Sequence, residues 1–408
     1  MQGIRQNNMN ILWISPMPVY DTVPHAGGKT WNFYLKRFAA EEDVRVRVLV
    51  FSKAEEANKI DWDKNIQYDV LLSKGSFWLN LRRVVTDIVG STLHGKSFCP
   101  YYKRRLLQKA LARLANSGYQ PDVIITEWTE MVVLIDLYRR YFPNAKTVAS
   151  EHDVSFVGLE RKLQAASKSF GRARRMAAFH RMANEELDAL KRYDIIAPQS
   201  DMDVQRLIQK GLDERMIHCL APYIQNMGKI WEGNKKQLLF YGAMYRPENY
   251  LSAMWFIENV LPSLNGKDIS FCALGNNPPS ALVEQASEKV RVPGYADDVS
   301  VYFRDSYCFV APLVLGAGIK VKVLEAMSSG IPLIANGIAM EGINAVAGRD
   351  YLHAETAKEF EDAIEMLLKH PERAQEIGAC GRKFFEANFD CEVSYQRYRA
   401  RLMKETGF

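Results

Sequence analysis

The chain has 408 residues, too many for one ordinary core, and its 48% hydrophobic and 25% charged content is typical of a globular protein. It contains no run of about 18 apolar residues, and its polar start lacks the apolar core of a signal peptide, so we expect a cytoplasmic protein. The six cysteines are scattered without a CxxC pair, and the seven histidines form no metal-binding pattern. The net charge of +5 is uneven, because residues 1–222 carry 33 Lys and Arg against 25 Asp and Glu. An anionic acceptor or membrane surface would suit that half.

Short apolar runs alternate with helical patterns through the first half, which predicts a parallel α/β sheet. The predicted strands are 10–15, 46–51, 122–126, 147–150 and 195–198, and the predicted helices are 29–40 and 103–115. Gly27 and Gly28 form a predicted glycine loop between the first strand and the first helix. His152 follows the strand at 147–150, between Glu151 and Asp153.

The segment 161–181 holds seven Lys and Arg, no acid and interleaved apolar residues. Three interpretations stay open for it. Such a segment can lie on an anionic lipid surface, bind a lipid-linked pyrophosphate acceptor, or form a solvated face. Arg82, Arg83 and the run 103–105 add to the basic character, but no nucleic-acid recognition motif accompanies them, so we expect no nucleic-acid partner.

A polar stretch with two glycines, 223–236, is the predicted linker to a second α/β region. The predicted strands there are 238–241, 269–274, 290–293, 307–313 and 333–335, and the predicted helices are 319–329, 357–368, 371–388 and 392–404.

The stretch 307–335 reads as strand, glycine turn, helix and strand. Gly316 and Gly318 form the turn, and Lys320 and Lys322 fall in the expected first turn of the helix, with Glu325 further along. A glycine loop that opens a helix after a strand exposes backbone N–H groups, and the helix dipole favours an anion there. The pattern therefore predicts a phosphate-binding site.

The sequence GAGIKVKVLEAMSSGIPLI, residues 316–334, resembles the donor-site signature of retaining family 4 glycosyltransferases, which have the GT-B fold. The resemblance implies two Rossmann-like domains facing across a cleft, an acceptor-side domain at 1–222 and a nucleotide-sugar domain at 223–388. Residues 389–408 would cross back to the first domain. By resemblance, Glu325 holds the ribose hydroxyls. The family usually has another Glu eight residues earlier, where this chain has Ala317.

The resemblance also assigns roles to single residues. His152 would lie against the donor sugar, as the candidate catalytic residue. The residues assigned to the donor nucleotide sugar are Gly27, Gly28, Gly242, Arg246, Gly316, Gly318, Lys320 and Glu325. The DxD triplets at 61–63 and 201–203 do not follow suitable strands, so we expect neither a metal nor a cofactor beyond the donor substrate.

The function implied by the resemblance is metal-independent transfer of a sugar, with retention, from a nucleotide-diphosphate sugar to an acceptor hydroxyl. The acceptor would be a glycan or lipid-linked molecule in bacterial polysaccharide assembly, with peripheral contact to an anionic membrane through the N-terminal domain. Two alternatives remain open. Ala317 favours a non-catalytic nucleotide-sugar-binding subunit, and a sugar-nucleotide 2-epimerase shares the fold.

Overall fold

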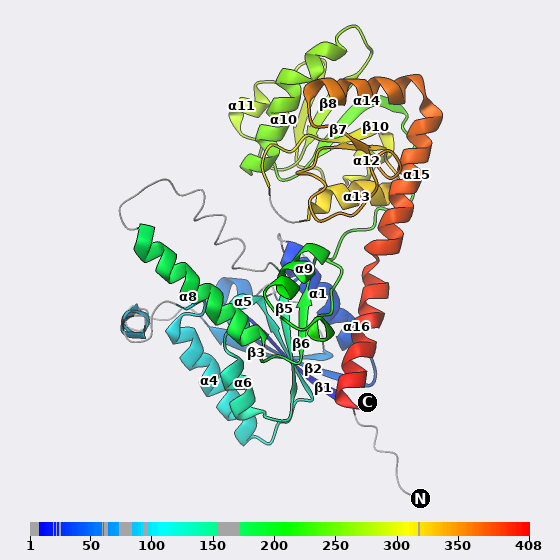
Figure 1. Cartoon of the computed structure of the whole chain (residues 1–408). Helices are drawn as coiled ribbons and strands as arrows, with labels where there is room; N and C mark the ends of the chain where they lie inside the picture. Colours follow the sequence, from blue (N-terminus) through cyan, green and yellow to red (C-terminus); the bar gives the residue numbers. More distant parts are fainter. Residues whose placement is uncertain are drawn as a thin grey trace, which may run out of the picture. The chain divides into compact units, whose positions relative to one another are not determined.

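The structure is a computed structural model, shown in Figure 1. The residues that it describes are 8–18, 20, 21, 23, 26–58, 60, 64–72, 84–90, 92, 97–152, 172–316 and 319–408. The chain forms two compact units, Met1–Tyr223 with Cys391–Phe408, and Ile224–Asp390. Each unit is described by itself.

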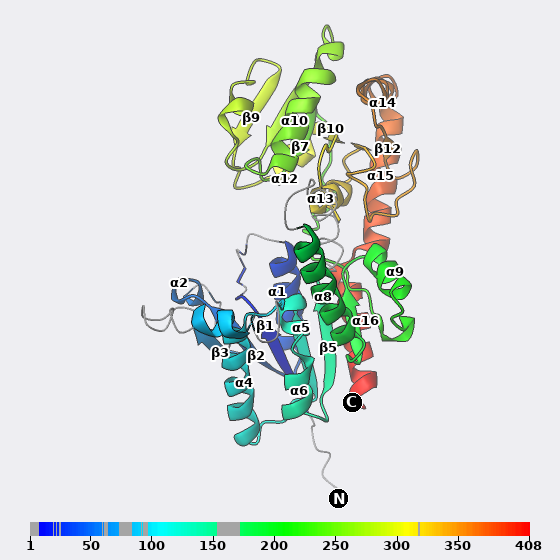
Figure 2. The same ribbon diagram turned by 60° about the vertical axis from the view of Figure 1, so that its left-hand side comes forward.

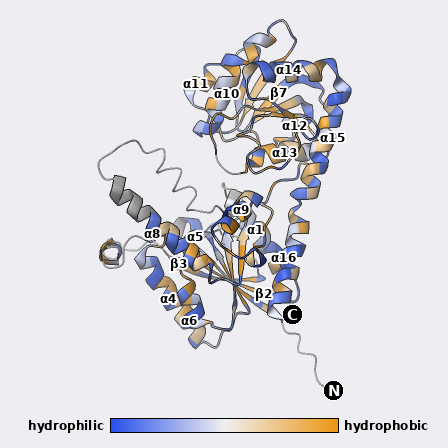
Figure 3. Cartoon of the chain, viewed as in Figure 1, coloured by the Kyte–Doolittle hydropathy of each residue, from blue (hydrophilic) through white to orange (hydrophobic). Residues whose placement is uncertain are grey.

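The first unit contains a six-stranded parallel sheet in the order β3-β2-β1-β4-β5-β6. Its strands are β1 (Met9–Ser15), β2 (Val44–Ser52), β3 (Ile66–Leu72), β4 (Val123–Glu127), β5 (Lys146–Glu151) and β6 (Ile195–Pro198). Successive side chains of a strand point to opposite faces, so Leu12 and Ile14 enter one core while Ile11 and Trp13 enter another. Figure 3 shows the resulting hydrophobic colour along the strands of this sheet.

Helices cover both faces of this sheet. They are α1 (Ala26–Ala39), α2 (Ala54–Ala57), α4 (Tyr101–Asn116), α5 (Trp128–Val132), α6 (Ile135–Tyr141), α8 (Arg172–Leu190), α9 (Asp201–Gln209), the 3-10 turn Glu214–Met216 and α16 (Cys391–Thr406). Helices α4 and α6 supply the core on one face, and α1 and α16 supply the core on the other (Figures 1 and 2). This is the layered arrangement that a parallel sheet requires, since both of its faces must be covered.

The last helix, α16, belongs to the first unit although it follows the whole second unit in sequence. Tyr395 and Tyr398 are fully buried against α1, where their rings lie 5.0 and 5.6 Å from the ring of Phe38. Arg399 adds an ion pair of 2.6 Å to Asp43. The prediction that the C-terminal helix crosses back to the first domain is confirmed.

The second unit repeats the same topology, with a six-stranded parallel sheet in the order β12-β11-β10-β7-β8-β9. Its strands are β7 (Lys235–Tyr241), β8 (Ser270–Leu274), β9 (Val290–Gly294), β10 (Ser306–Ala311), β11 (Leu333–Ala335) and β12 (Leu352–His353). Its helices are α10 (Pro247–Asn259), the 3-10 turn Leu261–Leu264, α11 (Ser280–Val283), α12 (Ser300–Asp305), α13 (Val321–Ser329), α14 (Ala357–Lys369) and α15 (Pro371–Asn388). The predicted α/β class with two Rossmann-like units is confirmed.

Three sequence-based details were wrong. The edge strands β3 and β12 were not predicted, because β3 carries polar residues such as Asp69, which pairs with Arg47, and β12 has only two residues. The linker ends earlier than position 236, since β7 begins at Lys235 and its pairing sets that limit.

The basic segment 161–181 lies mostly outside the described residues, which resume within it at the start of α8. No helix in the described parts of the chain is long and apolar enough to cross a membrane.

Candidate functional site

Each sheet has one point where the strand order reverses, between β1 and β4 in the first unit and between β7 and β10 in the second. Open parallel sheets bind ligands outside the carboxyl ends of the strands at such a point. The topology therefore directs attention to two places, and the residues singled out from the sequence lie at both.

In the first unit a buried carboxylate, Glu127, ends β4 and holds two side chains. Trp13 donates its indole N–H to Glu127 Oε1 over 2.7 Å, and His152 Nε2 lies 2.6 Å from Glu127 Oε2. On its other side His152 Nδ1 lies 2.5 Å from Gln199 Nε2. If the Gln199 amide donates to Nδ1, the proton of the ring lies on Nε2 and is donated to Glu127.

The plane of the His152 ring is fixed as well. Trp128, which follows Glu127 with a positive φ of 61°, stacks on the ring at 4.3 Å and 23°. A Cβ at Gly27 would lie 2.9 Å from His152 Nδ1, so a residue with a side chain would displace the ring. The positive φ of Trp128 is rare for a non-glycine residue, and backbone strain of this kind is found mostly at functional sites.

Gly27 and Gly28 lie in the first turn of α1 and not in a loop before it, because the helix already begins at Ala26. The structure brings Gly27 against His152. It also encloses a cavity of about 10 Å³ between Trp31, Glu127 and His152, which is enough for about one water molecule.

In the second unit the loop after β7 is packed through backbone atoms. A Cβ at Gly275 would lie 1.7 Å from the carbonyl oxygen of Gly242, and a Cβ at Gly242 would lie 2.9 Å from the Asn249 side chain. Arg246 ends this loop as the N-cap of α10 and pairs with Glu248. The missing side chains at Gly242 and Gly275 let the loops after β7 and β8 meet.

The loop after β10 contacts α10, where the backbone N–H of Val314 donates to Ser252 Oγ over 3.1 Å. Gly316 has φ +151°, and a Cβ there would lie 2.7 Å from Lys320 Cε. The Lys320 ammonium lies 3.6 Å from Glu341. Lys320 is the N-cap of α13 and not part of its first turn, because its backbone is extended (φ −94°, ψ 96°). Gly318 and Ala317 lie outside the described residues.

Lys322 was not among the predicted site residues, yet it lies at the centre of this cluster. Its ammonium donates to Asn249 Oδ1 and lies 4.8 Å from the centre of the Phe240 ring. Its pKa is lowered from 10.5 to about 7, mainly by burial; the charge of Glu248 opposes this shift, and the charges of Arg246 and Lys320 add to it. The sequence feature that could have indicated Lys322 is a second lysine, after Lys320, at the start of a helix whose other residues are mostly apolar.

Glu325 is 7% exposed on α13. Burial raises the pKa of Tyr241 to about 12, and the Glu325 carboxylate adds to that rise. The carboxylate therefore lies near the last residue of β7, at the carboxyl edge of the sheet.

This edge of the second sheet combines the cationic side chains of Arg246 and Lys320, the buried amine of Lys322, the N-termini of α10 and α13, and one carboxylate. Such a site suits a phosphate ester that also carries hydroxyl groups. Within the described residues no three His, Cys, Asp or Glu side chains cluster to hold a metal. Asp203 of one DxD triplet bonds Ser200 and Arg206, and residues 61–63 lie outside the described residues.

Comparisons with known proteins agree with this description. A family model described as "Glycosyl transferases group 1" matches residues 235–370, which include the whole cationic cluster. An uncharacterized 44.6 kDa protein in the cps region of Klebsiella pneumoniae is 23% identical over 165 residues. That match covers 38% of this chain and 42% of the relative's length.

Solved structures match over nearly the whole chain. HepE from Anabaena in complex with UDP has a TM-score of 0.66 at 13% identity, covering 97% of this chain and 100% of HepE. Sucrose-phosphate synthase from Thermosynechococcus elongatus has a TM-score of 0.65 at 16% identity, and the match covers 97% of this chain and 98% of the synthase chain. TarM has a TM-score of 0.63 at 10% identity, and the match covers 98% of this chain and 100% of the TarM chain. At these identities the similarity shows the fold, which is GT-B.

Proposed function

We propose that this protein is a glycosyltransferase that moves a sugar from a nucleotide-diphosphate sugar to an acceptor hydroxyl, with retention and without a metal cofactor. The observation that carries the proposal is the gathering of Arg246, Lys320 and Lys322 at the strand-order reversal between β7 and β10, with Glu325 beside them. The family match over 235–370 and the complexes of HepE with UDP and UDP-glucose support it.

In this proposal the second unit binds the donor. When the bond to the sugar breaks, negative charge develops on the leaving diphosphate. Preorganised cations and helix N-termini stabilise that charge without reorganisation. Gly242, Gly316 and Gly318 let the backbone approach the phosphates, and Glu325 accepts hydrogen bonds from the ribose hydroxyls. Retention follows if the leaving phosphate takes the acceptor proton on the same face.

The first unit supplies His152, and Gly27 and Gly28 at the start of α1. A neutral imidazole can both donate and accept a hydrogen bond, which suits the polarisation of a sugar hydroxyl. Its side chain is 5% exposed and both nitrogens contact protein groups. For Nδ1 to reach a sugar, the Gln199 amide has to turn aside while Glu127 keeps hold of Nε2.

The acceptor in this proposal is a glycan or lipid-linked hydroxyl in bacterial polysaccharide assembly, met by a cytoplasmic protein at the anionic inner face of the membrane. The relative in a cps region supports that setting. The excess of positive charge in residues 1–222 suits both the acceptor and the membrane.

A panel of UDP- and GDP-sugars tests the proposal. We expect one of them to raise the melting temperature of the protein, since a ligand that binds only the native state stabilises it. That sugar should then be transferred to an acceptor extract with its anomeric configuration retained and with no loss of rate in EDTA. Glu325→Ala should weaken binding of the same nucleotide by about 1–3 kcal/mol, the range for a lost charged hydrogen-bond partner.

Glu386→Ala is the matched control, because Glu386 pairs with Arg382 on α15. Equal affinity of the Glu325→Ala variant and the wild type would contradict the ribose role.

One sequence feature favours a second candidate, a nucleotide-sugar-binding subunit without activity. Ala317 occupies the position where the resembling family has a carboxylate near the donor sugar. Binding without transfer or hydrolysis would support this candidate, and interconversion of two sugar nucleotides would indicate an epimerase.

A further inference from the structure

A short helical segment of the first unit, residues 84–90, carries its apolar side chains on the outside. Val84, Val85, Ile88 and Val89 are between 49% and 61% exposed. A surface helix of a globular protein normally turns this stripe toward the core. A cluster of exposed aliphatic residues marks a surface that binds another protein or a membrane.

The contacts of this segment with α4 hold it in that orientation. Asp87 accepts a hydrogen bond of 3.0 Å from the backbone N–H of Tyr102, in the first turn of α4. Gly90 lies directly on the Tyr101 ring, and a Cβ there would come within 2.2 Å of a ring atom. Asp87 and Gly90 therefore contact α4, and the four branched side chains stay about half exposed.

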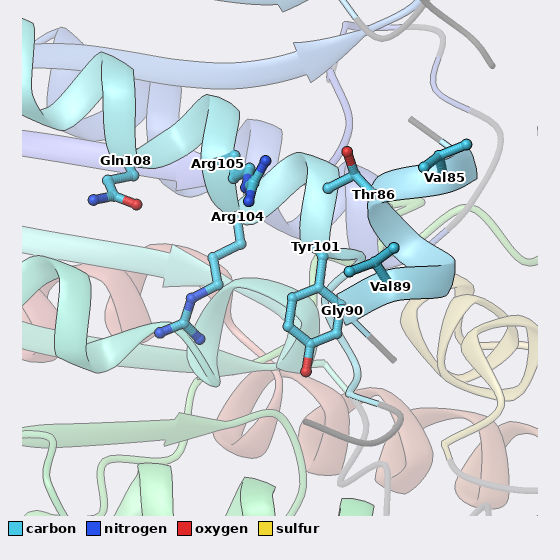
Figure 4. A pocket seen from close by; sticks show the side chains of 8 residues that line it. All are labelled: Val85, Thr86, Val89, Gly90, Tyr101, Arg104, Arg105 and Gln108. Carbon is cyan, nitrogen blue, oxygen red and sulfur yellow. The ribbon is translucent and has the colours of Figure 1, made fainter. Parts of the chain in front are cut away.

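Helix α4 supplies the charge beside these side chains. It contains five Lys and Arg and no acid, with three of the basic residues in its first turn and a half, where the helix dipole disfavours cations. A hollow of about 580 Å³ lies between the two helices. Figure 4 shows the side chains that line it. Val85 and Val89 line one side of it, and Arg104 and Arg105 line the other. Within the described residues neither guanidinium forms a salt bridge, and Arg105 is exposed.

We propose that these six residues, Val84, Val85, Ile88, Val89, Arg104 and Arg105, form a surface that docks on a bilayer of anionic phospholipid. This valine–arginine surface gives the proposed membrane partner a defined place in the fold. Branched aliphatic side chains enter the boundary between headgroups and acyl chains, while the arginines stay at the phosphates. Anionic lipid attracts each such cation near the surface.

The charge decides between a bilayer and a second copy of the chain. A twofold contact through this surface would place two pairs of arginines in one interface. Their mutual repulsion opposes such a dimer, whereas the lipid phosphates neutralise them.

Flotation with vesicles tests the inference on the full chain. We expect binding to vesicles of phosphatidylcholine and phosphatidylglycerol (1:1), weak binding to phosphatidylcholine alone, and release at high salt. Arg104→Gln with Arg105→Gln should lower the partition coefficient about 30-fold, which corresponds to about 1 kcal/mol for each arginine. Val85→Ser with Ile88→Ser should lower it about tenfold or more.

Two double variants serve as matched controls. Arg215→Gln with Lys358→Gln removes the same charge from exposed positions elsewhere, and Val283→Ser with Val301→Ser removes two other exposed valines. Both should bind like the wild type. All variants should keep a melting temperature close to that of the wild type, because none of the substituted residues belongs to a hydrophobic core of the described residues.

Three results would overturn the inference: equal binding of all variants, no binding of the wild type to the anionic vesicles, or a dimer in solution that Val85→Ser with Ile88→Ser dissolves. The test is separate from that of the proposed reaction, since the thermal shift with a sugar nucleotide is measured on the same proteins. A wild type that binds vesicles but no sugar nucleotide contradicts the reaction alone.

Discussion

At the scale of single residues, the arrangement around His152 depends on one carboxylate. Glu127 accepts from Trp13 with one oxygen and from His152 with the other, and the Gln199 amide takes the remaining ring nitrogen. Each polar atom in this series of hydrogen bonds has one partner. A substitution at Glu127 should therefore also alter the hydrogen bond at His152 Nδ1.

Glu127→Gln keeps the size of the side chain but replaces one acceptor by an NH₂ donor. Either Trp13 or His152 then meets a donor; the Trp13 indole N–H cannot accept, so the NH₂ group is better placed toward His152, whose ring has to change its tautomer or its position. We expect kcat for sugar transfer to fall about 10- to 100-fold, the range known for carboxylate partners of metal-bound histidines, while the KM for the donor sugar changes less than about threefold.

Glu405→Gln is the control for this variant, because Glu405 also pairs with cations, Lys146 and Arg401, but away from the carboxyl edge of the sheet. A kcat of wild-type size in Glu127→Gln would mean that the carboxylate has only a structural role.

Lys322 predicts a pH dependence of stability. Its pKa is lowered from 10.5 to about 7, mainly by burial. Between these values the unfolded chain binds a proton that the native protein does not, so the free energy of unfolding should rise with pH from about 7 to about 10.5. Lys322→Met should remove this rise and be more stable than the wild type at pH 6, with the two converging toward pH 10.5.

Urea denaturation at pH 6, 7.5 and 9 measures this, with Lys369→Met on the exposed end of α14 as the control. Parallel pH profiles for wild type and Lys322→Met would contradict the lowered pKa.

At the scale of elements, glycines decide how closely the loops at the carboxyl edge of the second sheet approach each other. Gly275 combines a φ of +150° with a contact on the Gly242 carbonyl, and Gly242 in turn lies on Asn249, which accepts from Lys322. The loops after β7 and β8 and the helix α13 are thus connected through backbone and short polar contacts.

Gly275→Ala should destabilise the second unit by about 2–5 kcal/mol, since it adds backbone strain to an overlap that only a backbone shift can relieve. Nucleotide affinity should fall with it, because the Gly242 loop has to move. Gly266→Ala shares a positive φ (+89°) but meets open space. It should cost only about 1–2 kcal/mol and leave nucleotide affinity unchanged. Thermal melting with and without UDP compares the two variants. Equal losses of stability in Gly275→Ala and Gly266→Ala would show that the overlap at Gly275 is relieved without a free-energy cost.

At the scale of the whole molecule, the first unit is completed by the end of the chain. Tyr395, Tyr398 and Leu402 of α16 are fully buried in the core that α1 and the first sheet form. The first unit therefore needs residues that are synthesised after the second unit.

Tyr398→Ala should destabilise the first unit by about 3–5 kcal/mol, the range for truncation of a buried aromatic side chain. We expect its unfolding transition in urea to shift while that of the second unit stays in place. Phe408→Ala, at an exposed end of the chain, should change stability by less than about 0.5 kcal/mol. A shift of the second unit alone would contradict the place of α16 in the first core.

Local pattern was enough to predict most strands, the turn at Gly316 and the sequence 316–334 that carries the family resemblance, while the predicted loop at Gly27 and Gly28 is the first turn of α1. Buried parallel strands are short apolar runs, and a glycine turn needs specific residues, so both are visible along the chain. The contact between Glu127, His152 and Gln199 was not visible, because these residues are 25 and 47 positions apart. The order of β4, β5 and β6 in the sheet brings them together. The central place of Lys322 and the outward valines of 84–90 were likewise settled only by tertiary packing, since burial and exposure depend on neighbours that are distant in sequence.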